Sequence, residues 1–119
     1  MKEALTIKKL EEQVLELYKE MQTIDFTEYV ELVELLESTD GYYPKGVWYR
    51  DEYVRTTKSI SKYINGLMNE IIDAKMELIT IDESKFERNI REASSDIADV
   101  KEWLKSDIEK LKVAPKYED

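Results

Sequence analysis

The sequence predicts an all-α protein, an antiparallel helical bundle built around one long, coiled-coil-like hairpin. Three observations lead to this prediction. The 119 residues include only three Gly and two Pro, whereas a β fold needs such residues at its many turns. Apolar residues recur at alternating spacings of three and four, the period of packed helices. A chain of this length typically forms one domain, so we expect a single helical-bundle domain over residues 1–119.

The first helix is expected at about residues 3–24, where one face is apolar and the opposite face is charged. Its seam consists of Ile7, Leu10, Val14, Leu17, Met21 and Ile24. A short second helix is expected at about residues 26–38. Asp25 and Glu28 have the spacing of a capping box at its start, and Gly41 suits the left-handed position that follows a helix.

Two long helices are expected at about residues 51–80 and 84–112. Ser84 and Glu87 form a second capping-box pattern, and Gly66 indicates a close helix crossing. The short turn between these helices permits only an antiparallel hairpin, with the first helix alongside and the second as a cap. The apolar seam of the third predicted helix consists of Thr57, Ile60, Ile64, Leu67, Ile71, Ala74, Leu78 and Ile81. A second apolar stripe beside this seam consists of Met68, Ile72, Met76 and Ile79. The seam of the fourth predicted helix consists of Phe86, Ile90, Ala93, Ile97, Val100, Leu104, Ile108 and Leu111.

Missing residue types exclude several kinds of chemistry. The chain has no Cys, so disulfides, thiolate metal sites and cysteine nucleophiles cannot form. It also has no His, which excludes phosphohistidine transfer, Ser-His catalysis and Glu-x-x-His di-iron sites. The N-terminus does not resemble a signal peptide and no apolar run could span a membrane, so we expect a cytoplasmic protein. Fourteen Lys against four Arg favour an AT-rich genome, such as that of a Firmicute or one of its phages.

The negative charge is concentrated near the N-terminus. The chain carries a net charge of −9, and no basic residue occurs between Lys19 and Lys45. An acidic surface repels the phosphate backbone of nucleic acids. We therefore expect no nucleic-acid partner and no membrane contact.

The second predicted helix has more apolar surface than one packing face requires. Apolar side chains cover roughly 220° of its circumference at about 100° per residue, whereas a bundle face needs only about 100° or somewhat more. Acidic residues recur every third position between the apolar ones. The surplus is explained either by a partner chain or by burial on two sides within the domain, and the sequence leaves both open.

A loop rich in aromatic residues follows this helix at residues 42–50, where Pro44 and Gly46 interrupt any helix. Tyr and Trp dominate interface hot spots, although the same rings could simply seal the end of the bundle. Helix and loop together predict a binding surface for a basic protein partner. Its predicted residues are Tyr29, Leu32, Leu35, Tyr42, Tyr43, Trp48, Tyr49 and Tyr53.

These features predict a non-enzymatic interaction protein without a cofactor. Suitable classes are a small acidic adaptor, an inhibitor, an antitoxin or an immunity-type protein. The heptad seams could also be completed across a homo-oligomer, which the sequence does not distinguish from packing within one chain.

An enzymatic alternative rests on two carboxylate pairs. Glu31 and Glu34 share one face of the second predicted helix, and Glu70 and Asp73 share one face of the third. Four such oxygen ligands across a helix pair could hold Mg²⁺. The pattern resembles the all-α nucleoside-triphosphate pyrophosphohydrolases of the MazG-like group, a resemblance that implies these four residues as magnesium ligands. The competing interpretation is an ordinary solvated acidic face.

Overall fold

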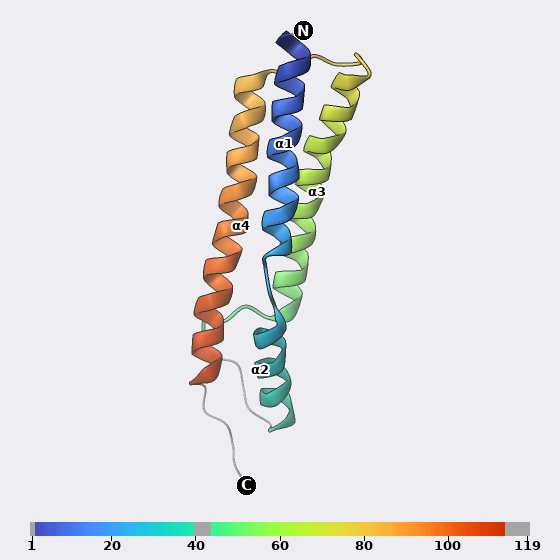
Figure 1. The fold of residues 1–119 in the computed structure, drawn as a ribbon. Coiled ribbons are helices and arrows are strands. Elements are labelled where there is room, and N and C mark those ends of the chain that lie inside the picture. The colour runs from blue at the N-terminus through green and yellow to red at the C-terminus, as the bar shows by residue number, and fades with distance from the viewer. Residues whose placement is uncertain (1, 40–43, 114–119) are drawn as a thin grey trace.

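The computed structural model describes residues 2–39 and 44–113, and within these ranges the chain is helical, with no strand. The all-α class predicted from the sequence is therefore confirmed. None of the helices in the described part is long and apolar enough to cross a lipid bilayer. The helices are α1 (Lys2–Gln22), α2 (Thr27–Ser38), α3 (Arg50–Lys75) and α4 (Glu83–Lys112) (Figure 1).

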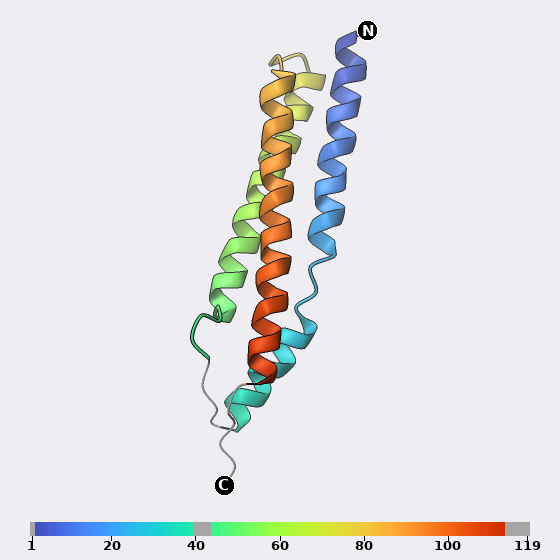
Figure 2. The same cartoon turned by 90° about the vertical axis from the view of Figure 1, so that its left-hand side faces the viewer.

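The helices form a rod. As predicted, α3 and α4 run antiparallel as a long hairpin, and α1 packs along both of them (Figures 1 and 2). The short helix α2 occupies the end opposite the α3–α4 turn, where it continues the direction of α1 and packs on α4. At 1.5 Å per residue, α1 and α2 together span roughly 50 Å, close to the roughly 45 Å of α4. The radius of gyration of 19.2 Å accordingly exceeds the ~13.5 Å of a compact chain of this length.

The core follows the predicted heptad seams. Each fully buried aliphatic side chain stabilises the fold by roughly 1.5–3 kcal/mol relative to an exposed one, so these seams are the main source of stability. The buried seam residues are Leu10, Val14 and Leu17 of α1, Ile60, Ile64, Leu67, Ile71 and Ala74 of α3, and Phe86, Ala93, Ile97, Val100, Leu104 and Leu111 of α4.

The break between α1 and α2 forms without Gly or Pro. The Thr23 hydroxyl donates to the carbonyl of Glu20 (2.7 Å), a local bond that competes with continuation of the helix. The N-cap position of α2 is Phe26 rather than the predicted Asp25, and it makes no side-chain cap bond. The Asp25 carboxylate instead accepts a hydrogen bond (2.9 Å) from the N–H of Thr27, the first residue of the helix. Ile24 and Phe26 pack against the core between the helices, which keeps the linking segment attached to the bundle.

Helix α3 ends at Lys75 rather than at the predicted Thr80. The N–H of Leu78 donates to the carbonyl of Asp73 (2.9 Å) and that of Glu77 to the carbonyl of Ala74 (3.0 Å), which is a Schellman motif. Glu77 adopts φ 61°, a left-handed conformation that usually requires Gly or Asn. Because neither residue occurs here, heptad periodicity alone extended the predicted helix too far. Leu78, expected in the seam, is 67% exposed instead.

Two local predictions were also wrong. Helix α4 is capped by Asp82, whose carboxylate accepts a hydrogen bond from the Lys85 N–H (3.2 Å), whereas Ser84 already lies inside the helix. Gly66 does not mark a close crossing, because a Cβ atom added there would meet no atom within 4 Å.

The substitution Gly66→Ala is therefore expected to raise the free energy of unfolding by about 0.5–1 kcal/mol. Ala is the better helix former, and the added methyl group has room at this exposed position. Urea denaturation followed by circular dichroism measures the change, and a loss of stability would show that the site is crowded after all.

The substitution Glu77→Gly is expected to stabilise the protein by about 0.5–1 kcal/mol, because glycine adopts the left-handed conformation without steric cost. The matched control is Glu102→Gly at an exposed position inside α4, which removes the same charge and should cost about 1 kcal/mol. Equal destabilisation by both variants would contradict the assigned turn geometry.

Candidate binding surface

A cluster of aromatic rings joins α2, α3, α4 and the segment before α3. Tyr53 of α3 lies at its centre, with ring centroids 5.6 Å from Phe26, 5.1 Å from Tyr29 and 5.3 Å from Trp48. Trp48 in turn packs on Trp103 of α4, with centroids 4.7 Å apart. The rings meet edge-on or tilted, the arrangement that aromatic pairs prefer. This cluster, the aromatic belt, therefore connects the end of the α3–α4 hairpin to α2. It consists of Phe26, Tyr29, Trp48, Tyr53 and Trp103.

A buried carboxylate holds this belt in place. Asp107 of α4 is only 4% exposed, and its Oδ2 accepts hydrogen bonds from the Tyr53 hydroxyl and from the Trp48 backbone N–H (3.2 Å). The Tyr29 hydroxyl donates to the Trp48 carbonyl (2.6 Å), so both backbone polar groups of Trp48 are bonded to the bundle. A buried polar network is stabilising when its members are satisfied, and no described buried side-chain N or O atom lacks a partner.

The sequence contained a signal for this carboxylate that hydropathy alone overlooks. Asp107 follows Val100 and Leu104 and precedes Leu111 at spacings of four, three and four, so it occupies a seam position of α4. The hydrophobic pattern instead assigned the seam to Ile108, which is only partly buried. An acidic residue at a seam position needs buried donors, and Trp48 and Tyr53 supply them.

Burial and the neighbouring carboxylate also change the acidity of Tyr53. Its hydroxyl is removed from water, and the hydrogen bond and negative charge of Asp107 further disfavour a phenolate. Both effects raise the pKa of Tyr53 well above its usual value near 10. The Tyr53 hydroxyl of the folded protein therefore stays protonated to a higher pH than that of an exposed tyrosine.

The outer side of α2 differs from its buried side. Tyr29, Val33 and Leu36 face the core, whereas Val30 is 37% and Leu35 is 42% exposed. The apolar surplus predicted for this helix therefore remains partly in solvent. The bundle thus covers the apolar residues on one side of α2 and leaves Val30 and Leu35 partly exposed.

The carboxylates of α2 are largely unneutralised. Glu28 forms an ion pair with Lys112 of α4 (2.7 Å). The other three, Glu31, Glu34 and Glu37, are exposed, and none forms an ion pair within the described part of the chain. The exposed apolar side chains of α2 therefore lie on the same helix as three glutamates that form no ion pair in the described part of the chain.

A small apolar pocket opens between α2 and the start of α3. It has a volume of about 230 Å³, and Phe26, Val30 and Val54 line it together with Tyr29, Tyr53 and Thr57. Arg50 stands at the same pocket and is the one charged residue among its lining. The pocket has the size and lining to receive one apolar side chain of another molecule.

The predicted contact residues divide into three groups. Tyr29 (1% exposed) and Tyr53 (2% exposed) belong to the core, so their rings are unavailable to a partner while the fold is intact. Their expected contact role is corrected to a structural one, because the Asp107 network and the aromatic belt bury them. Leu32 and Trp48 are partly buried, and Leu35 and Tyr49 are exposed, the latter to 56%. Tyr42 and Tyr43 lie outside the described residues.

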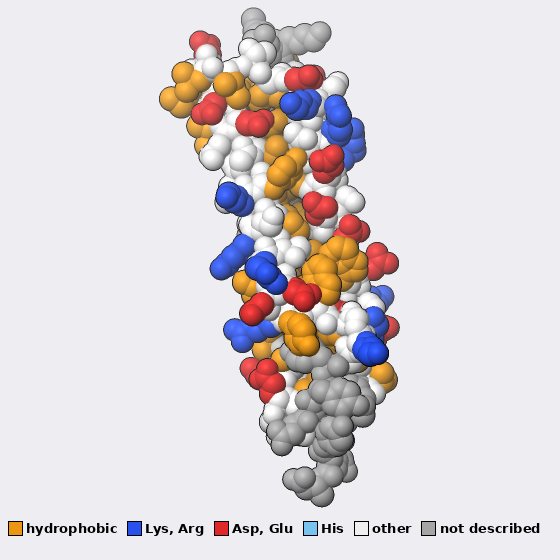
Figure 3. All heavy atoms as spheres, turned by 180° about the vertical axis from the view of Figure 1, so that it is seen from behind, with side chains coloured by type: hydrophobic (Ala, Val, Ile, Leu, Met, Phe, Trp, Pro, Cys, Tyr) orange, Lys and Arg blue, Asp and Glu red, His pale blue; other side chains and the backbone are white. Residues whose placement is uncertain are grey.

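Trp103 was missing from the predicted surface. It is 42% exposed on α4 and stacks against Trp48, so it extends the aromatic belt to the surface. Only the fold reveals this, since 55 positions in sequence separate the two rings. Figure 3 shows hydrophobic side chains gathered over this part of α4 and, separately, at the end that carries the α3–α4 turn.

The four carboxylates of the enzymatic alternative do not come together in one chain. Glu31 and Glu34 lie on α2, at the end of the rod where α3 begins. At 1.5 Å per residue, roughly 30 Å of helix separates that end from Glu70, and Asp73 lies farther still. No group of three or more Asp or Glu residues in the described part is placed to hold a metal ion.

Comparisons with protein-family models, with curated proteins and with solved structures found no match to this chain.

The raised pKa of Tyr53 predicts a loss of stability at alkaline pH. Above pH 10 the unfolded chain releases the Tyr53 proton while the folded chain retains it, so the free energy of unfolding falls as pH rises. The contribution of this one group is at most about 1.4 kcal/mol per pH unit.

In the variant Tyr53→Phe, that alkaline slope should become shallower, because the group that titrates only after unfolding is absent. At neutral pH the same variant should lose about 1–3 kcal/mol, since Asp107 loses a buried donor. Chemical denaturation between pH 7 and 11 measures both effects. An unchanged slope would mean that Tyr53 ionises as readily in the folded protein as in the unfolded one.

Proposed function

We propose that this protein is a non-enzymatic binding module that contacts a protein partner with the α2 end of the rod. The contact surface comprises the exposed residues Val30, Leu35, Tyr49, Val54 and Trp103 together with the carboxylates of α2. The observation that carries the proposal is the apolar pocket at Phe26, Val30 and Val54, which also includes Arg50 and adjoins helix α2. The glutamates Glu31, Glu34 and Glu37 of that helix form no ion pair in the described part of the chain.

Rigidity supports this surface as a binding site. Trp48 is fixed by hydrogen bonds at both its N–H and its carbonyl, and Trp103 packs on its ring. Aromatic anchors that are already immobilised lose little conformational entropy on binding, which favours affinity. The surface is therefore preorganised rather than formed by the partner.

The charge of α2 indicates the chemistry of the partner. Glu31, Glu34 and Glu37 have no intramolecular counter-charge among the described residues and would attract Lys or Arg side chains across an interface. The partner we infer has a basic surface and at least one projecting apolar side chain. Adaptors, inhibitors, antitoxins and immunity-type proteins all work through such contacts.

The rod shape leaves ample surface for this contact. The chain exposes 8462 Å², whereas a compact monomer of 14.1 kDa exposes roughly 6,700 Å². A standard interface removes about 800 Å² from each partner. One end of the rod can supply that area while the core stays intact.

The variants Val30→Glu and Trp103→Ala are expected to lose partner binding by tenfold or more, because they remove an apolar contact at the centre of the surface. The matched control is Tyr63→Ala, which truncates a comparably exposed aromatic residue in the middle of α3. Immobilised wild type and variants would capture the partner from an extract of the source cells, and far-UV circular dichroism would monitor folding.

Binding should also weaken as salt rises, since screening reduces attraction between a basic partner and α2. Retention of the partner by both Val30→Glu and Trp103→Ala, with loss in Tyr63→Ala, would contradict the proposed surface.

A further inference from the structure

The opposite end of the rod carries an apolar turn. Turns at the tip of a hairpin are ordinarily polar because solvent surrounds them. Here Met76 is 63%, Leu78 67% and Ile79 42% exposed, and Ile72 in the last turns of α3 is 45% exposed. Together these side chains present on the order of 400 Å² of surface, within the range of the largest patches on monomers, which are often functional.

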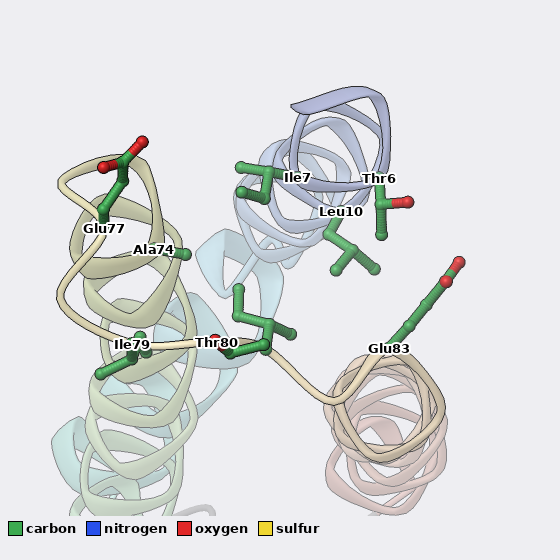
Figure 4. Close-up of a pocket in the computed structure, with 9 residues that line it drawn as sticks. Thr6, Ile7, Leu10, Ala74, Glu77, Ile79, Thr80 and Glu83 are labelled. Atoms are coloured by element: carbon green, nitrogen blue, oxygen red, sulfur yellow. The ribbon is translucent and has the colours of Figure 1, made fainter. Parts of the chain in front are cut away.

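A groove lies directly beside this apolar turn. It has a volume of about 570 Å³ and lies between α1, the end of α3 and the turn. Ile7 and Leu10 of α1 and Ala74 of α3 point toward its interior, while the carboxylates of Glu77 and Glu83 point away from it (Figure 4). A second hollow of about 530 Å³ shares Ile7, Ala74 and Glu77 with the first and extends the groove between α1 and α3.

The left-handed residue of the turn creates this shape. At Glu77 the chain leaves the helix axis, so that Leu78 projects into solvent instead of entering the seam. A projecting apolar side chain therefore lies next to a groove that combines the apolar residues Ile7, Leu10 and Ala74 with the polar lining residues Thr6, Glu77, Thr80 and Glu83. Such a surface is self-complementary, which is what a twofold symmetric interface requires.

Part of the charge at this end is paired within the chain, although Glu77 and Asp82 form no ion pair among the described residues. Lys75 pairs with Glu11, and Lys9 pairs with Glu83 (3.6 Å) and Glu87 (3.4 Å). Two copies of a chain with net charge −9 repel each other, and the repulsion is smallest where carboxylates already have neighbouring lysines. The lysines at this end therefore offset part of its negative charge and lower the repulsion that a second copy meets there.

We infer that two copies of this chain associate through the α3–α4 turn as a twofold dimer, each placing Leu78 in the groove of the other over Ile7 and Leu10. The interface would bury on the order of 1,000 Å² in total, the lower limit for a specific contact. An interface of this size is expected to form reversibly. It leaves the α2 end of each copy free at the far ends of the dimer.

Sedimentation equilibrium between about 1 and 200 µM tests this inference. The wild-type mass is expected to rise with concentration from 14.1 kDa toward twice that value. Leu78→Glu should remain at the mass of one chain throughout, with unchanged helicity, because Leu78 is exposed and has no part in the core. The matched control Leu35→Glu makes the same change on α2 and should dimerise like the wild type.

A wild type that stays at one chain mass at 200 µM would overturn the inference. So would dimerisation of Leu78→Glu, or loss of dimerisation in Leu35→Glu, which would move the interface to α2. A mass that grows beyond two chains would exclude the closed twofold arrangement. These outcomes are independent of the partner contact proposed above, which depends on the α2 end alone.

Discussion

The carboxylate of Asp107 organises the whole α2 end of the rod. It lies in the hydrophobic seam of α4, where an unpaired charge would be costly, and it receives hydrogen bonds from Tyr53 and from the backbone of Trp48. The segment before α3 must therefore cross to α4 to satisfy it. That crossing brings Trp48 against Trp103 and Tyr53 against Tyr29. The packing of Trp48 on Trp103, a residue of the proposed partner surface, thus depends on this buried acceptor.

The two ends of the rod have different physical characters. At the α2 end, exposed apolar residues stand among glutamates without ion pairs in the described part, which suits a basic partner. At the turn end, exposed apolar residues lie near Glu11, Glu83 and Glu87, which are paired with lysines of the same chain, and the contact proposed there is with another copy. Between them, α1 and the hairpin form a uniform heptad core that separates the two surfaces. The two proposed contacts can therefore be tested independently.

Much of the fold could be predicted from the sequence because heptad spacing is a strong signal over long helices. The seam residues of α1, α3 and α4 follow it closely, as Val14, Ile64 and Val100 illustrate. The end of α3 could not be predicted, because the left-handed turn uses Glu77 where Gly or Asn would have been recognised.

The candidate surface was predicted only in part. The number of apolar residues around α2 indicates more apolar surface than one packing face needs. It does not indicate which of these residues the bundle buries. Tyr29 proved to be core and Leu35 exposed. Asp107 was overlooked because an acidic residue is ordinarily assigned to solvent, and Trp103 because its contact with Trp48 exists only in the folded chain.

Hydrogen exchange at the Trp48 amide tests most directly whether Asp107 organises this end. The structure predicts slow exchange in the wild type, because the N–H is bonded to a buried carboxylate. In Asp107→Ala the Trp48 amide should exchange much faster, while the amide of Ile64 in the middle of α3 stays protected. Rapid exchange at Trp48 in the wild type, at the rate of an unstructured segment, would contradict the account.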